Sequence, residues 1–142
     1  MEPVRILLDT SFLLPIIGIQ VREVEEIINK LWVKYKKKEV KIYYTDLNII
    51  ELTWKLSKVT YNPQVVEIGL VSIERNFAKI SPKPSSILKA IELKKKGFND
   101  LIDLLLYTTA KDNNLMFLTL DTKLIEFLSR VGEDVSIILT SI

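Results

Sequence analysis

Short apolar runs alternate along this chain with longer segments in which apolar residues recur at helical spacing. The short runs are rich in β-branched, aromatic and leucine side chains, as in strands that are buried on both faces of a sheet. Strands are predicted at Val4–Leu8, Val40–Tyr44, Met116–Leu120 and Val135–Thr140, with a short strand or an extended connection at Phe77–Ile80. Because strands that alternate with helices build parallel sheets, we predict one domain over residues 1–142, an α/β fold that forms a three-layer α/β/α sandwich around a mostly parallel sheet.

Capping signals set the expected bounds of the helices. The expected caps are Thr10 or Ser11 for a short helix, Thr45, Asn62 with Pro63 behind it, and Asn99. A Lys-rich turn followed by Gly97 is a typical helix end. The remaining helices are predicted over residues 21–38, 46 to about 58, 63 to about 76, 85 or 86 to 96, 100 to about 113, and 121–130.

The chain contains no cysteine and no histidine. Disulfides, thiolate nucleophiles, Ser-His-Asp triads and metal sites with Cys or His ligands are therefore excluded. A net charge of +2, from 20 basic and 18 acidic residues, does not by itself indicate a nucleic-acid partner. A metal site in this chain would use hard oxygen ligands, which favours magnesium or manganese.

Four acidic residues are expected at one edge of the predicted sheet. Asp9 and Asp121 follow the carboxyl ends of two strands, and parallel strands place these ends on the same side. Helices that return between parallel strands begin near that edge. Asp103 lies in the first turn of one such helix, and Glu51 lies about 8 Å along the axis of another.

Asp103 is the most informative of these acids. Its neighbours in the run Leu101–Tyr107 are apolar nearly all round, which predicts a buried helix. Burying an unpaired carboxylate costs free energy, and several carboxylates close together repel one another. A divalent cation removes both costs, so the pattern predicts a metal site.

These segments resemble the motifs of the PilT N-terminal (PIN) domain family. The resemblance lies in Ile6–Ser11, in the capped helix from Thr45 through Glu51 to Leu56, in Asp103–Ala110, and in Leu118–Asp121. The four motifs occur in order along nearly the whole chain. Residues 61–99 show no such pattern, and we expect substrate specificity to lie there.

Resemblance to the PIN family implies a ribonuclease that hydrolyses RNA with one or two magnesium or manganese ions. The implied catalytic and metal-binding residues are Asp9, Glu51, Asp103 and Asp121. The residues implied to orient waters or carboxylates around them are Thr10, Ser11 and Thr119, with Asp100 as an outer ligand. A homodimer is implied as well, and a VapC-type toxin would also have a small antitoxin partner.

Each acid also has a purely structural interpretation. Asp9 and Asp121 would each serve as the N-cap of a helix. Asp103 would be stabilised by a helix dipole. Glu51 would pair with Lys55 one turn later on an exposed helix face.

Other conspicuous residues are predicted to be structural. The lysines of residues 34–38 and 94–96 end helices, where solvated lysines are favourable, although they could bind RNA phosphates. The aromatic residues that could stack on bases, but are predicted to lie in the core, are Trp32, Tyr43, Tyr44 and Trp54. Trp54 could also face a dimer partner.

Three other functions compete with a nuclease. A PIN-like module without catalysis would bind RNA or protein but no metal. A nucleotide-binding α/β domain needs a Gly-rich loop, and the four glycines here are isolated. A phosphoacceptor domain needs adjacent acids after its first strand, whereas Asp9 precedes Thr10 and Ser11.

The N-terminal segment predicts the location of the protein. Residues 1–9 carry three charged side chains and no secretory signal. The apolar run over residues 12–19 is too short to span a bilayer. We therefore expect a cytoplasmic protein with no membrane segment.

Overall fold

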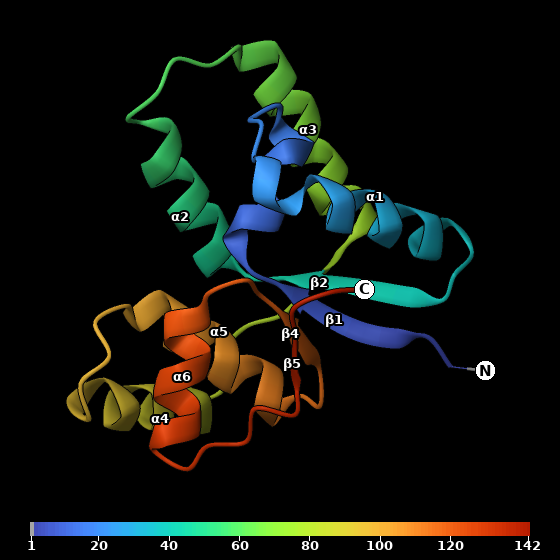
Figure 1. Ribbon diagram of the computed structural model, residues 1–142. Helices are drawn as coiled ribbons and strands as arrows, with labels where there is room; N and C mark the ends of the chain where they lie inside the picture. Colours follow the sequence, from blue (N-terminus) through green and yellow to red (C-terminus); the bar gives the residue numbers. More distant parts are fainter. Residues whose placement is uncertain (1) are drawn as a thin grey trace.

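The computed structural model describes residues 2–142 and consists of a central sheet with helices on both faces (Figure 1). The strands are β1 (Val4–Leu8), β2 (Val40–Tyr44), β3 (Ala78–Lys79), β4 (Met116–Leu118) and β5 (Ile138–Leu139). Their order is β3-β2-β1-β4-β5, and every neighbouring pair is parallel. The parallel sheet is confirmed, although β4 and β5 are shorter than the predicted strands.

Alternate residues of β1, β2, β4 and β5 enter two separate apolar clusters, one on each face of the sheet. Ile6 and Leu8 face one cluster, whereas Leu7 faces the other. The first cluster is covered by η1 (Thr10–Phe12), η2 (Pro15–Ile17), α1 (Arg22–Lys36), α2 (Asp46–Leu56) and α3 (Pro63–Asn76). The second is covered by α4 (Pro84–Lys95), α5 (Leu101–Asp112) and α6 (Thr122–Arg130). The predicted three-layer α/β/α sandwich is therefore confirmed.

The observed caps confirm some expectations and correct others. Thr45 caps α2, and Asn62 caps α3 through its side-chain oxygen. Asn99 is not the cap of α5, because the Asp100 carboxylate reaches the amide of Asp103 and the helix begins only at Leu101. Helix α4 begins at Pro84, since proline is preorganised for the first helical position.

The short 3-10 helix after β1 also differs from the expectation. Thr10 and Ser11 lie inside η1 and do not cap it, and Asp9 occupies the N-cap position without a side-chain capping bond. This geometry leaves the Asp9 carboxylate available for other contacts.

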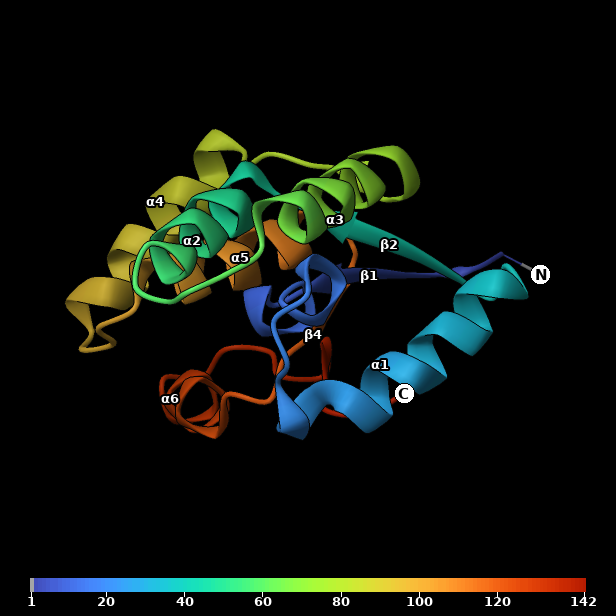
Figure 2. The ribbon, with the colours of Figure 1, turned by 90° about the horizontal axis from the view of Figure 1, so that it is seen from above.

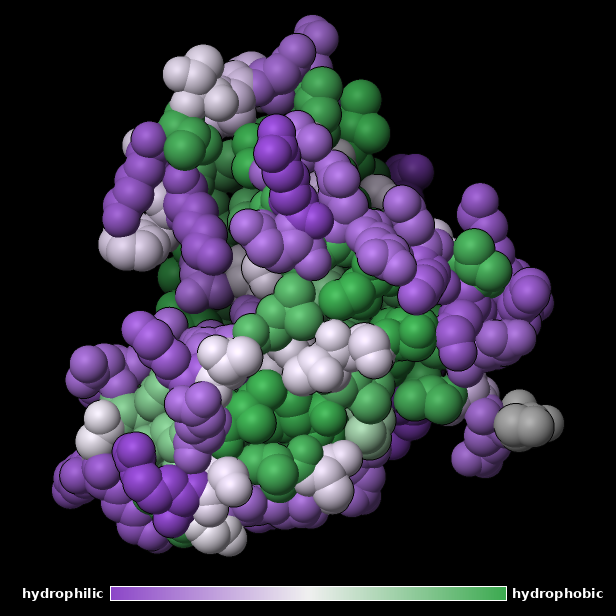
Figure 3. Space-filling model, viewed as in Figure 1, coloured by the Kyte–Doolittle hydropathy of each residue, from purple (hydrophilic) through white to green (hydrophobic). Residues whose placement is uncertain are grey.

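All the strands point to one side of the molecule. Figure 2 shows β1 running from the N-terminus toward the side where α2, α5 and α6 lie. On the face seen in Figure 3, apolar side chains gather around the sheet edge formed by β5, between hydrophilic margins. Strand β5 pairs through only two residues, and such a short edge strand offers little backbone to another chain.

None of the helices over residues 2–142 has both the length and the hydropathy that are needed to cross a membrane.

Helix α3 packs closely on the segment after β1. A Cβ atom at Gly69 would collide with the carbonyl oxygen of Ile16 and lie 2.7 Å from the Cα atom of Ile17. Both are backbone atoms, so they cannot move aside as the end of a side chain can. The glycine is therefore required by a close approach of two backbones.

We expect Gly69→Ala to destabilise the protein by roughly 1–3 kcal/mol, although alanine is favoured in helices by about 1 kcal/mol. Urea unfolding of the variant measures the change. Glu67→Ala, at an exposed position of the same helix, is the control and should change stability little. Equal stability of the two variants would contradict the close packing of α3.

Candidate active site

The four predicted acids meet at the carboxyl edge of the sheet. Asp9 directly follows β1, and its backbone amide donates to the carbonyl oxygen of Leu118 at 3.0 Å. Asp103 lies in the first turn of α5 with only 8% of its surface exposed. Glu51 in α2 and Asp121 at the start of α6 are half-buried. Side chains from four segments distant in the sequence therefore lie at one edge of the sheet.

The tightest group of carboxylates includes one residue that was expected only at the periphery. Glu51, Asp100 and Asp103 each offer an oxygen atom, and these atoms lie within 4.8 Å of one another. Asp9 and Asp121 lie beside this group, where both raise the pKa of Asp103. The site therefore contains five acids, and Asp100 is a central member.

Burial and mutual repulsion dominate the electrostatics. Burial raises the pKa of the Asp9 carboxyl from 3.8 to about 6, and Glu51 adds to the rise, while a hydrogen bond from Thr119 opposes it. Burial raises the pKa of Asp103 to about 9, and the charges of Asp9 and Asp100 are the next contributions. Without a cation the group takes up protons, because it cannot hold all of its negative charge.

The alternative structural role of Glu51, a pairing with Lys55, is not found. Within residues 2–142 the two side chains are not at ion-pair distance, although the charge of Lys55 lowers the pKa of Asp9. Lys55 is half-buried beside the acids.

Two of the acids combine a capping role with their place in the site. Oδ1 of Asp121 accepts from the amide of Leu124 at 3.1 Å, so it does cap α6. Oδ1 of Asp100 accepts from the amide of Asp103 at 3.1 Å in the same way. Each cap uses one carboxylate oxygen and fixes the direction of the other.

Thr119 connects two of the acids. Its hydroxyl donates to Oδ2 of Asp9 at 2.8 Å and accepts from the backbone amide of Asp121 at 3.1 Å. The residue is fully buried, so these contacts are shielded from water. Thr119 thus holds Asp9 in place.

A buried asparagine that the sequence analysis did not identify supports the site. Asn48 donates from Nδ2 to the carbonyl oxygen of Leu8 at 3.1 Å and to the hydroxyl of Thr10 at 3.0 Å. Its Oδ1 accepts from the amide and the hydroxyl of Thr45. Asn48 therefore ties the start of α2 to the end of β1. The sequence signal for this role is the spacing Thr45-x-x-Asn48, which resembles a capping box.

Ser11, which the family resemblance implied as a residue that orients water, is half-buried in η1.

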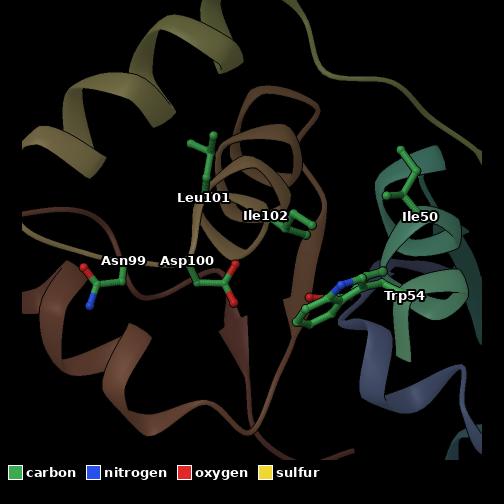
Figure 4. Close-up of a pocket in the computed structure, with 7 residues that line it drawn as sticks. Ile50, Trp54, Asn99, Asp100, Leu101 and Ile102 are labelled. Atoms are coloured by element: carbon green, nitrogen blue, oxygen red, sulfur yellow. The ribbon is translucent and has the colours of Figure 1, made fainter. Parts of the chain in front are cut away.

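The acids lie between two pockets. One, of about 520 Å³, lies between α2 and α5 and includes Glu51 and Asp100 among its lining residues (Figure 4). The other, of about 460 Å³, lies between residues 97–100, which precede α5, and helix α6, and is lined by Asp100, Asp121, Lys123 and Arg130 among others. Asp100 borders both pockets, so the site is accessible from two sides.

The donor set fits a hard divalent cation. All the available ligands are carboxylate oxygens, which magnesium and manganese prefer. Three of these oxygens lie within 4.8 Å of one another, so they are close enough to approach one ion together. The buried charge, the ligand type and the spacing agree, so the residues fit such an ion.

The PIN domain family model matches residues 6–130. The chain belongs to the PIN domain family. The matched residues include all five acids of this PIN domain, together with Asn48 and Thr119. No curated protein matches the chain.

Solved structures of toxin–antitoxin proteins share the fold of this PIN domain. VapBC2 from Rickettsia felis, bound to a DNA fragment from its promoter, is 19% identical, with a TM-score of 0.65 over 91% of this chain and 94% of the other. VapC20 from Mycobacterium tuberculosis, described as a toxin that cleaves the sarcin–ricin loop, is 14% identical, with a TM-score of 0.66 over 91% and 96%. A toxin–antitoxin complex from Klebsiella pneumoniae is 17% identical, with a TM-score of 0.63 over 96% and 98%. At these identities the likeness concerns the fold.

The raised pKa values predict how stability depends on pH when no metal is present. The unfolded chain loses protons near pH 3.8, whereas Asp9 and Asp103 keep theirs in the folded state to about pH 6 and 9. Their contribution to stability is therefore fully present below pH 3.8 and is lost as the pH rises through these higher values.

We expect Asp103→Asn to be more stable than the natural protein in EDTA at pH 8, by roughly 1–3 kcal/mol, and to differ less at pH 5. Urea unfolding at both pH values measures this. Manganese should then stabilise the natural protein more than the variant. A parallel loss of stability with pH in both proteins would contradict the assigned repulsion.

We expect Asn48→Ala to destabilise the protein by roughly 2–4 kcal/mol, because the buried groups of Leu8, Thr10 and Thr45 lose their partner. Denaturant unfolding is the measurement. Asn76→Ala is a matched control, since the side-chain amide of Asn76 is exposed and donates only to Ser72 of the same helix. Similar losses in both variants would argue against a special role for Asn48.

Proposed function

We propose that this PIN domain is a metal-dependent endoribonuclease that hydrolyses phosphodiester bonds in RNA. The observation that carries the proposal is the group of carboxylates in which Glu51, Asp100 and Asp103 lie within 4.8 Å of one another. Within residues 2–142 none of the five acids forms an ion pair with lysine or arginine, so their charge is available to a divalent cation. Membership of a family of nucleases supports the same activity.

Each residue has a defined role in this proposal. The residues that hold magnesium or manganese are Asp9, Glu51, Asp103 and Asp121, with Asp100 as a further ligand. When bound, the ion would supply an activated water and would neutralise charge on the phosphate. Thr119 orients Asp9 through their hydrogen bond, and Thr10 positions the chain after Asp9 through Asn48. Ser11, which is half-buried in η1, has the proposed role of orienting water at the same edge.

The proposal includes a toxin–antitoxin setting, with a small antitoxin protein as partner and a homodimer as the working form. The fold is shared with toxin–antitoxin complexes, which supports this setting. Helices α3 and α4 also carry exposed apolar residues that suit a protein contact. These residues are Val65, Ile68, Val71, Ile87, Leu88 and Ile91. An enzyme that acts on cellular RNA in this way works in the cytoplasm.

Cleavage of labelled single-stranded RNA tests the proposed activity. We expect cleavage with manganese or magnesium, none with EDTA, and a loss of at least about a hundredfold in Asp9→Asn, because a ligand is removed. Asp46→Asn is the control, since Asp46 is an exposed acid in α2 that pairs with Lys79 and should leave activity unchanged.

Calorimetric titration with manganese separates the remaining outcomes. If the protein neither cleaves RNA nor binds the metal, the nuclease assignment is wrong and a binding module without catalysis takes its place. Metal binding that Asp103→Asn weakens, together with cleavage, would support both parts of the proposal.

A further inference from the structure

The pocket between α2 and α5 is mainly apolar, and its polar lining residues are Glu51, Asp100 and Asn99. It is lined by Ile50, Glu51, Trp54, Asn99, Asp100, Leu101 and Ile102. Its volume of about 520 Å³ lies in the range of sites for small organic groups. Glu51 and Asp100 belong both to this pocket and to the carboxylate group. Whatever fills the pocket therefore lies directly beside the proposed reaction centre.

Trp54 is exposed at the mouth of this pocket, although its sequence context predicted a core position. Its side chain is 61% exposed, and that of Ile50, one turn earlier, is 59% exposed. Figure 4 shows Trp54 and Ile102 projecting toward each other from α2 and α5, with the Asp100 carboxylate beside them. Lys58 places Nζ 3.3 Å from the centroid of the Trp54 ring and so occupies one face. The Trp54 ring is thus held in place by Lys58 and is not packed in the core.

We propose that this pocket binds one unpaired base of the RNA substrate, which stacks against Trp54 beside the phosphate to be cleaved. The inference rests on the proposed ribonuclease function. A ligand that fits here must combine a flat apolar ring with an anion that reaches the metal-binding acids, and a nucleotide joins the two through a single sugar. Aromatic stacking on a base is a common way to bind single strands.

Charge on both sides of the acids favours a nucleic acid over a protein in this pocket. Lys58 lies at the Trp54 side, and Lys123 and Arg130 line the second pocket across Asp100. Cations on both sides suit a polyanion that passes over the site, whereas an apolar protein segment gains nothing from them. A base inside a duplex is stacked and paired, so the substrate is unpaired at this position.

Tryptophan fluorescence tests the inference directly. The chain has two tryptophans, and Trp32 stacks on Phe77 with ring centroids 5.8 Å apart. Trp32→Phe keeps an aromatic ring there and leaves Trp54 as the sole tryptophan, which is excited selectively at wavelengths that tyrosine does not absorb. The fluorescence of this variant is measured in the presence of manganese, before any RNA is cleaved. The variant is titrated first with an unstructured six-nucleotide RNA and then with the same strand lacking all its bases.

We expect saturable quenching by the RNA and binding of the abasic strand that is weaker by roughly ten- to a hundredfold. In Trp54→Ala, followed by the polarisation of a labelled RNA, the two strands should bind with similar affinity. Val33→Ala, at an exposed apolar position of α1 outside the pocket, should still discriminate between them.

Equal affinity for both strands in the protein with Trp54, or discrimination that survives in Trp54→Ala, would overturn the inference. A protein that cleaves RNA without a response from Trp54 keeps its proposed function and loses this subsite, and the pocket then belongs to a protein partner. If the protein neither cleaves nor binds RNA, both the proposed function and this base-binding site are wrong.

Discussion

Five carboxylates lie together at the carboxyl edge of a parallel sheet, and the rest of the structure has to offset the repulsion between them. Parallel pairing brings the ends of β1 and β4 together, and the helices that return over the sheet add Glu51 and Asp103 at the same edge. The resulting burial raises the pKa of Asp103 to about 9. An arrangement that is unfavourable without a cation is maintained by two apolar clusters, one on each face of the sheet. The burial of apolar side chains in these two clusters thus offsets the electrostatic repulsion at the sheet edge. Carboxylates with shifted pKa values of this kind are common at functional sites.

Precise placement of the acids depends on buried polar contacts more than on the apolar layers. Asn48 joins α2 to β1, and Thr119 joins β4 to Asp9 and to the start of α6. Each of these side chains has partners on more than one element, so a shift of one element would leave a buried group unsatisfied. The apolar clusters tolerate small adjustments of volume, whereas these hydrogen bonds specify one relative position.

The sequence was sufficient to predict those features of the fold and the site that depend on local sequence pattern and on the order of the strands and helices. Strands β1 and β2 were predicted to the residue, and Asp9 and Asp103 could be placed because one follows a buried strand and the other interrupts an apolar helix. The central position of Asp100 could not be predicted, because it depends on how α5 packs beside α2, some 50 residues earlier in the chain. Trp54 was predicted to be buried and is not. Helix α2 buries Leu52 and Leu56, but its apolar surface is wider than the face that the sheet covers.

That excess apolar surface has a consequence for where specificity lies. From the sequence, substrate specificity was predicted to lie in residues 61–99, because no family pattern extends through them. The pocket that borders the acids is instead built by α2 and the first turn of α5, within the very segments that carry Glu51 and Asp103. On the proposed function, the same two helices would then hold the metal ligands on one side and the base on the other. Substitutions at Ile50, Trp54 or Ile102 could change which base is accepted without altering a ligand. A site of this kind can change its substrate while the carboxylates stay fixed.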